Sequence, residues 1–164
     1  PENVGCNIKS PVEFLVGLGR RFLLKFHRFE ALFKMQEKLG MQLFYPPNVA
    51  GWPGGKNFID SSTLVWRLRI PALMVSERER SNKVAEPREE DAAMEEPVPN
   101  TNILGAKVNW DLLLPSFERF GNEELMGLFL MQSPPQGISD NIKKITDKKE
   151  CILKILSLPE YSLT

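Results

Sequence analysis

Few side chains in this chain have the types and spacing that catalysis or metal binding requires. It contains one histidine, His27, and two cysteines, Cys6 and Cys151, which stand near opposite ends. A zinc site needs several such ligands close together, so we expect no zinc site. Carboxylates could still bind a hard cation, but no loop has the alternating acidic spacing of such a site, so no metal and no cofactor are predicted. Two unrelated thiols are the preferred interpretation of the cysteines, and a disulfide joining the two ends is the alternative.

Two short motifs resemble catalytic motifs only superficially. The hydroxyls of Asp60-Ser-Ser-Thr63 could supply a nucleophile, but these residue types are also good helix caps, and the chain has no G-x-S-x-G motif. Gly51-Trp-Pro-Gly-Gly-Lys56 is rich in glycine, but no serine or threonine follows its lysine. We therefore expect helix capping from the first motif and no phosphate loop from the second.

The stretch 43–60 is the most distinctive part of the sequence. It combines three prolines, which restrict the backbone, with three glycines, which permit positive φ, and with six large apolar residues. The apolar residues predict a stiff, buried connector between two helices. The candidate ligand or partner residues of this loop are Tyr45, Asn48, Trp52, Gly54, Gly55, Asn57 and Asp60.

Two interpretations of this loop remain open. In the structural one, Trp52 fills the junction between helices, and the asparagine side chains bond to turn backbone. In the functional one, Tyr45 and Trp52 form a stacking platform beside Asn48 and Asn57 for a sugar or a peptide.

Apolar periodicity predicts helices on both sides of the loop. Ser10-Pro11-Val-Glu13 is a helix start with a capping box, and it precedes a face made of Val12, Leu15, Val16, Phe22, Leu23 and Phe26. A second helix is expected over 28–39 with a stripe of Phe29, Leu32, Phe33 and Leu39. A third follows Asp60 or Ser61, buries Leu64, Val65 and Leu68, and kinks or ends at Pro71.

The C-terminal half is expected to hold fewer regular elements. A short strand or extended segment over 106–110 is predicted, then a helix capped by Asn122, a loop over 136–145, and a last helix that starts at Asp147. The predicted fold class is all-α: an irregular bundle of four to five helices with a rigid Pro/Gly/aromatic loop. Residues 1–164 would form one domain of a longer chain.

The balance of charged residues limits the classes of partner that we expect. Lys and Arg number 21, as do Asp and Glu, so the net charge is zero and nucleic acid is not expected as a partner. Residues 76–102 are acidic and lack aromatic residues, which predicts a charged, partly disordered linker or insertion. No apolar run approaches the length of a membrane span in this segment.

Three segments resemble a known family. Lys9-Ser-Pro-Val-Glu-Phe14, Leu39-Gly-Met-Gln-Leu-Phe-Tyr-Pro-Pro-Asn-Val-Ala-Gly-Trp-Pro-Gly-Gly55 and Ile59-Asp-Ser-Ser-Thr-Leu64 look like the C-terminal part of the bacterial domain-of-unknown-function family numbered eighteen hundred. The end of the chain is similar to that family's S-P-E-[FY]-Q pattern, with departures at Leu158 and Ser162. The resemblance is good over 9–75 and loose over 120–164, and the acidic insertion has no counterpart.

This resemblance implies a fragment of a longer protein, whose missing N-terminal part would hold half of any site, and it favours an extracytoplasmic setting. It supplies no activity or catalytic residue. The leading hypothesis is a non-enzymatic helical module that packs against the remainder of its own parent chain or a protein partner. The alternatives are part of a hydrolase or carbohydrate-binding protein, and a cell-surface assembly protein tethered by the acidic stretch.

Overall fold

The computed structural model describes residues 7–26, 29–75 and 106–164. This part of the chain is mostly helical, which confirms the predicted class. It holds seven α-helices rather than four to five: α1 (Pro11–Arg21), α2 (Phe29–Lys38), α3 (Ser61–Val75), α4 (Trp110–Glu118), α5 (Asn122–Phe129), α6 (Gln136–Lys143) and α7 (Lys148–Leu156). Two short 3-10 helices, η1 (Gly55–Phe58) and η3 (Pro159–Ser162), and one pair of two-residue strands complete it.

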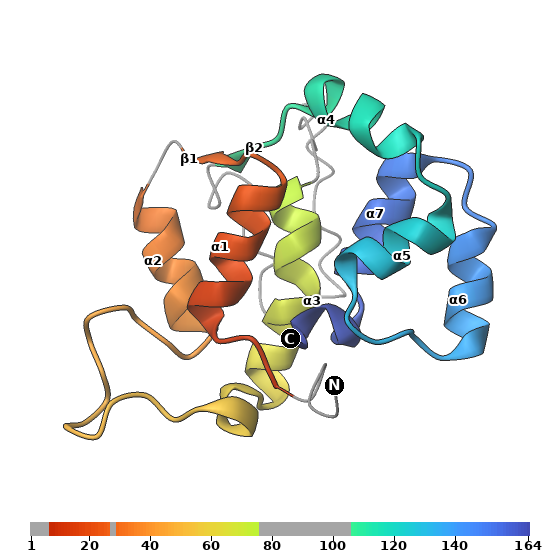
Figure 1. Cartoon of the computed structure of the whole chain (residues 1–164). Coiled ribbons are helices and arrows are strands. Elements are labelled where there is room, and N and C mark those ends of the chain that lie inside the picture. The colour runs from red at the N-terminus through yellow and green to blue at the C-terminus, as the bar shows by residue number, and fades with distance from the viewer. Residues whose placement is uncertain (1–6, 27–28, 76–105) are drawn as a thin grey trace, which may run out of the picture.

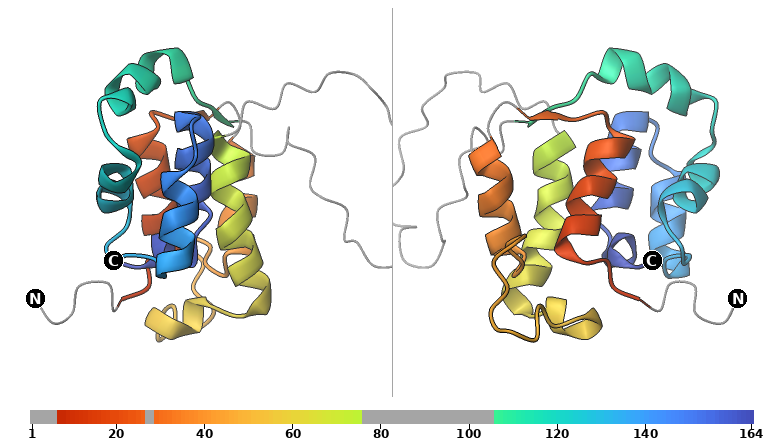
Figure 2. Two further views of the ribbon diagram at one scale, coloured as in Figure 1. Left: turned by 90° about the vertical axis from the view of Figure 1, so that its right-hand side faces the viewer. Right: turned by 60° about the vertical axis from the view of Figure 1, so that its left-hand side comes forward.

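The helices form an irregular bundle. Helices α1 and α3 lie in its middle, with α2 on one side and α5, α6 and α7 on the other (Figure 1). Helix α4 crosses one end of the bundle, beside the strand pair. The right-hand view in Figure 2 shows the same order. The strands β1 (Lys25–Phe26) and β2 (Ala106–Lys107) are antiparallel, with Phe26 opposite Ala106.

Helix α1 starts as predicted and buries part of the predicted face, including Leu15 and Phe22. The Ser10 hydroxyl accepts a bond from the Glu13 amide, and the Glu13 carboxylate accepts one from the Ser10 amide. The buried positions of α1 and the residue that follows it are Pro11, Phe14, Leu15, Leu18 and Phe22. This set has the helical spacing i, i+3, i+4, i+7, i+11, so Val16 and Leu23, which we had placed in the apolar face, are exposed instead.

The large aromatic residues of helix α2 do not face the core as we predicted. Ala31, Met35 and Leu39 are buried at intervals of four, whereas Phe29 and Phe33 are exposed. The predicted stripe was therefore right for Leu39, which is fully buried, and partly right for Leu32, which is half-buried. It was wrong for Phe29 and Phe33, which lie on the outer side of the helix.

Helix α3 continues through the proline that we expected to kink or end it. Pro71 lies inside the helix and is buried, although it lacks the amide that would bond the carbonyl four residues earlier. The residues that α3 buries before Pro71 are Thr63, Arg67 and Ile70, and Val65 is exposed. We had predicted that Leu64, Val65 and Leu68 form the buried side. That prediction was wrong for Val65, and Leu64 and Leu68 are only half-buried.

Two helices escaped prediction. Only residues 106–107 of the predicted strand pair with another strand, and α4 begins at Trp110 because the Asn109 side chain caps it. Pro115 lies inside α4 and does not end it. The predicted loop over 136–145 contains α6. The predicted insertion 76–102 lies outside the described residues.

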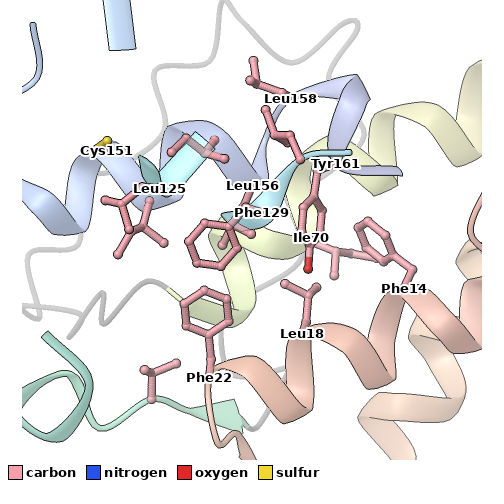
Figure 3. Packing of buried hydrophobic residues seen from close by; sticks show 14 of the residues in the cluster. Phe14, Leu18, Phe22, Ile70, Leu125, Phe129, Cys151, Leu156, Leu158 and Tyr161 are labelled. Atoms are coloured by element: carbon pink, nitrogen blue, oxygen red, sulfur yellow. The ribbon is translucent and has the colours of Figure 1, made fainter. Parts of the chain in front are cut away.

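The core of the bundle joins residues from both halves of the chain (Figure 3). Phe22 of the α1 end stacks on Phe129 of α5 with ring centroids 5.9 Å apart, and Phe117 and Trp110 of α4 pack beside them. Ile152, Ile155 and Leu156 of α7 are buried, as predicted.

The described ends of the chain meet at one edge of this core. Ile8 and Leu163 form an antiparallel bridge, and the Lys9 amide donates to the Ser162 carbonyl at 2.8 Å. The Thr164 amide donates to the Asn7 carbonyl at the same distance.

Candidate functional site

The loop between α2 and α3 is far more exposed than its composition predicted. It leaves the end of α2, runs beyond the edge of the bundle and returns to α3 (Figure 1). Phe44 is 82% exposed and Tyr45 is 75% exposed, and Val49 is fully exposed. The expectation of a wholly buried connector was therefore wrong for this outer arm of the loop.

Local hydrogen bonds define the tip of the outer arm. The Asn48 side chain accepts a bond from the Ala50 amide at 2.9 Å, and the Asn48 carbonyl accepts one from the Gly51 amide at 3.1 Å. Gly51 has φ +90°, a conformation that residues with a Cβ rarely adopt. The asparagine thus satisfies turn backbone, which is the structural interpretation offered for it.

The base of the outer arm carries an unusual backbone conformation. Phe44 has φ +71°, which is sterically costly for a residue with a large side chain. The Leu43 amide before it donates to the Gln36 side chain at 2.9 Å, and the Tyr45 amide after it donates to the Gln42 carbonyl at 3.0 Å. These bonds hold Phe44 where its ring points into solvent rather than into the core.

The returning arm is the part of the loop that packs on the bundle. Phe58 of η1 is buried, and Trp52 and Ile59 are half-buried. Gly54 precedes η1 and Gly55 begins it with φ +59°, while Asn57 is exposed. The loop is therefore anchored at its second end, and its first arm is presented to solvent.

Asp60 serves as the helix cap that we predicted. Its carboxylate accepts a bond from the Thr63 amide at 2.8 Å, and its own amide donates to the Thr63 hydroxyl at 2.8 Å. The bond from the Thr63 amide is the main cause of a lowered pKa of Asp60. A carboxyl group that stays ionised and is engaged in this way is a poor general acid.

The predicted site residues fall into two groups. Tyr45 and Asn48 lie on the exposed arm; Trp52, Gly54, Gly55, Asn57 and Asp60 follow on the arm that returns to α3. Phe29 and Phe33 on the outer side of α2 were not among the candidates. Helix α2 and the loop occupy the same side of the bundle (Figure 2). We call Phe29, Phe33, Phe44, Tyr45 and Val49 the aromatic surface.

Other possible sites offer little chemistry. A cavity of about 410 Å³ lies between α6 and α7, lined by Ile138, Ile142, Lys154 and their neighbours, and none of its lining residues belongs to the loop. Within the described ranges, no group of three or more His, Cys, Asp or Glu side chains is placed to hold a metal. The same ranges contain no helix that is long and apolar enough to cross a membrane.

Among the described residues, the thiol of Cys151 is poorly placed to act as a nucleophile. Cys151 is fully buried in α7, and burial raises the pKa of its thiol, which makes the reactive thiolate scarcer. Cys6 and His27 lie outside the described residues, so the structure leaves their pairing and role as predictions.

One charged residue that sequence reasoning passed over is fully buried. Arg67 of α3 is 1% exposed, on the face that also carries Thr63 and Ile70. Its spacing of four and three from these residues was available in the sequence. An arginine among apolar positions is normally assigned to the solvent side, so this spacing did not lead us to predict that Arg67 is buried.

Comparison with known proteins places the chain in a family but adds no function. No curated protein and no solved structure matched it. Residues 2–163, nearly the whole chain, match the family described as "Protein of unknown function (DUF1800)". This match is consistent with the resemblance carried by the P-P-N-V-A-G-W-P-G string of the loop. The chain therefore belongs to the DUF1800 family.

Proposed function

We propose that this chain is a non-enzymatic helical interaction module, and that the aromatic surface is where it packs against the remainder of its parent chain or a protein partner. The observation that carries the proposal is the exposure of Phe44, Tyr45 and Val49 on the outer arm of a loop whose other end is anchored by the buried Phe58. Large apolar side chains gathered on one side of a molecule are characteristic of protein interfaces.

The geometry of the loop supports a role in holding its apolar side chains exposed for a binding partner. Phe44 adopts a costly φ value while its ring lies 82% exposed, so the conformation gains nothing from burial in this chain. The Asn48 turn and the anchored arm around Phe58 hold the projecting residues without covering them. Binding by such a preformed surface would lose little conformational entropy.

The test is site-specific photo-crosslinking in the full-length protein as its host makes it. A photoreactive phenylalanine replaces Tyr45, and a matched variant carries it at Val16 of α1, which is also exposed. We expect one defined crosslink from position 45, to another part of the same chain or to one partner, and none of comparable yield from position 16. The triple change Phe44→Ser, Tyr45→Ser, Val49→Ser should weaken that contact at least tenfold.

Two results would remove the proposal. One is equal crosslinking from both positions. The other is a turnover reaction that Trp52→Ala or Asn48→Ala abolishes, which would favour a substrate site formed by the loop.

A further inference from the structure

The core of the bundle contains a guanidinium group without a hydrogen-bond partner. Arg67 is 1% exposed, and within the described part of the chain its Nε, Nη1 and Nη2 atoms are buried and make no hydrogen bond. Desolvation lowers the pKa of Arg67, although arginine remains protonated in proteins. A buried charge needs a compensating group, so this arrangement is costly unless an anion reaches it.

An aromatic ring lies beside this charge, and a second ring packs against the first. The Arg67 Cζ atom lies 5.5 Å from the centre of the Phe14 ring, and the Phe14 ring packs edge-on against Tyr161 at 5.6 Å. Figure 3 shows Phe14 and Tyr161 beside Ile70, from α1, η3 and α3. The rings offer partial compensation through their π faces, but they cannot accept the several hydrogen bonds that a guanidinium donates.

A second cation borders the same two rings. Lys9 is half-buried; its Nζ atom lies 4.2 Å from the centre of the Tyr161 ring and donates to the Tyr161 carbonyl at 2.5 Å. Burial, helped by the charges of Arg21 and Arg67, lowers the pKa of Lys9 to about 8. Glu13 opposes this shift, but its carboxylate already bonds the Ser10 amide at 2.7 Å.

The charges that act on Lys9 are mostly positive. Arg21 and Arg67 both lower the pKa of Lys9, and Glu13 is the carboxylate that raises it. Glu160 of η3 has a buried Oε2 atom without a hydrogen bond, but among the described residues no ion pair joins it to Arg67. Within the described ranges, no carboxylate is hydrogen-bonded to the guanidinium of Arg67.

We propose that Arg67, together with the nearby Lys9, is a binding site for the carboxylate of a small organic acid. The planar guanidinium matches the two oxygens of a carboxylate, and a monoanion is easier to desolvate among aromatic rings than a phosphate dianion. Because Arg67 is only 1% exposed, the ligand we propose is a small molecule and not a protein segment. The inference is independent of the aromatic surface, which belongs to another part of the fold.

The experiment uses propionate as the probe and thermal unfolding as the readout, at pH 7 and constant ionic strength. Propionate should raise the melting temperature of the wild-type protein, whereas chloride and inorganic phosphate should not. Arg67→Met should abolish this rise, and Arg69→Met, which changes an exposed arginine of the same helix, should keep it. Without propionate, Arg67→Met should raise the melting temperature, because it removes an uncompensated charge.

Two further variants keep the test decisive if Arg67→Met fails to fold. Arg67→Lys retains the charge but loses the two-pronged geometry, so propionate should bind at least tenfold more weakly. Because Lys9 loses its proton above about pH 8, propionate affinity should fall several-fold between pH 7 and pH 9 in the wild type. It should fall less in Lys9→Arg, which stays charged.

Three outcomes would overturn the proposal. Propionate could stabilise Arg67→Met as much as the wild type, or phosphate could act as strongly as propionate. In the third, Arg67→Met and Glu160→Gln each lower stability and their effects are not additive. That result would show that Glu160 neutralises Arg67 inside the chain and that no ligand is needed.

Discussion

At the scale of single residues, capping was the feature most readable from the sequence. The bonds at Ser10, Asp60 and Asp147 join side chains to amides two or three residues away, so the partners are fixed by local spacing. Arg67 is the opposite case. Its spacing from Thr63 and Ile70 is visible in the sequence, but its burial depends on α1 and η3, which are distant in the sequence, so the local spacing alone does not predict it.

The Asp60 cap gives a prediction about acid. The pKa of Asp60 in the folded chain lies below that of an aspartate in an unfolded chain, so the stabilising effect of its carboxylate is fully present above about pH 4 and is lost as the pH falls through the lower folded value. Asp60→Ala should therefore lose less stability than the wild type between pH 5 and pH 2.5.

Thermal unfolding across that pH range measures the difference. Asp140→Ala, at an exposed position in α6, is the matched control and should follow the wild type. Parallel curves for the wild type and Asp60→Ala would show that the carboxylate does not contribute through its charge.

At the scale of elements, the existence of helices was predictable and their orientation was not. Helix α2 has large apolar residues on one side and Ala31, Met35 and Leu39 on another, so its periodicity fits two faces. Neighbouring helices decide which face is buried, and a single sequence does not specify them. The loop shows the same limit: proline, glycine and aromatic residues indicated restricted backbone, but not that Phe44 and Tyr45 would face solvent.

The aromatic cluster that joins α1, α4 and α5 should be the most sensitive part of the bundle. Phe22 is fully buried and contacts the rings of Trp110, Phe117 and Phe129. Phe22→Ala should lower the free energy of unfolding by about 3–5 kcal/mol, because it leaves a cavity among rings that are held by separate helices.

Chemical denaturation measures this change in the free energy of unfolding. Phe33→Ala provides the control, since Phe33 lies on the exposed side of α2, and it should change stability by less than about 0.5 kcal/mol. A larger effect of Phe33→Ala than of Phe22→Ala would contradict the assignment of buried faces.

At the scale of the whole molecule, the two ends of the described chain close the fold. Residues 7–9 pair with residues 162–164, and Tyr161 packs against Phe14 beneath this pairing. A contact between positions so far apart in sequence was not predictable from either segment alone.

Hydrogen exchange tests this closure. The amides of Lys9 and Thr164 donate to backbone carbonyls at the joined ends, so they should exchange slowly and together. Tyr161→Ala should accelerate both. The Tyr45 amide, which bonds Gln42 in the exposed loop, should keep its rate. Acceleration of only one of the two amides would mean that they do not open as one unit.

The adjacency of residues 7 and 164 has a practical consequence. A short glycine linker could connect them, and new termini could be opened beside Val49, where the backbone is solvent-exposed. Such a circular permutant should fold with the same core. The cut would also release the segment around Phe44 and Tyr45 from the closed loop. Partner binding by the permutant would then show whether the rings alone suffice or whether the intact loop conformation is also needed.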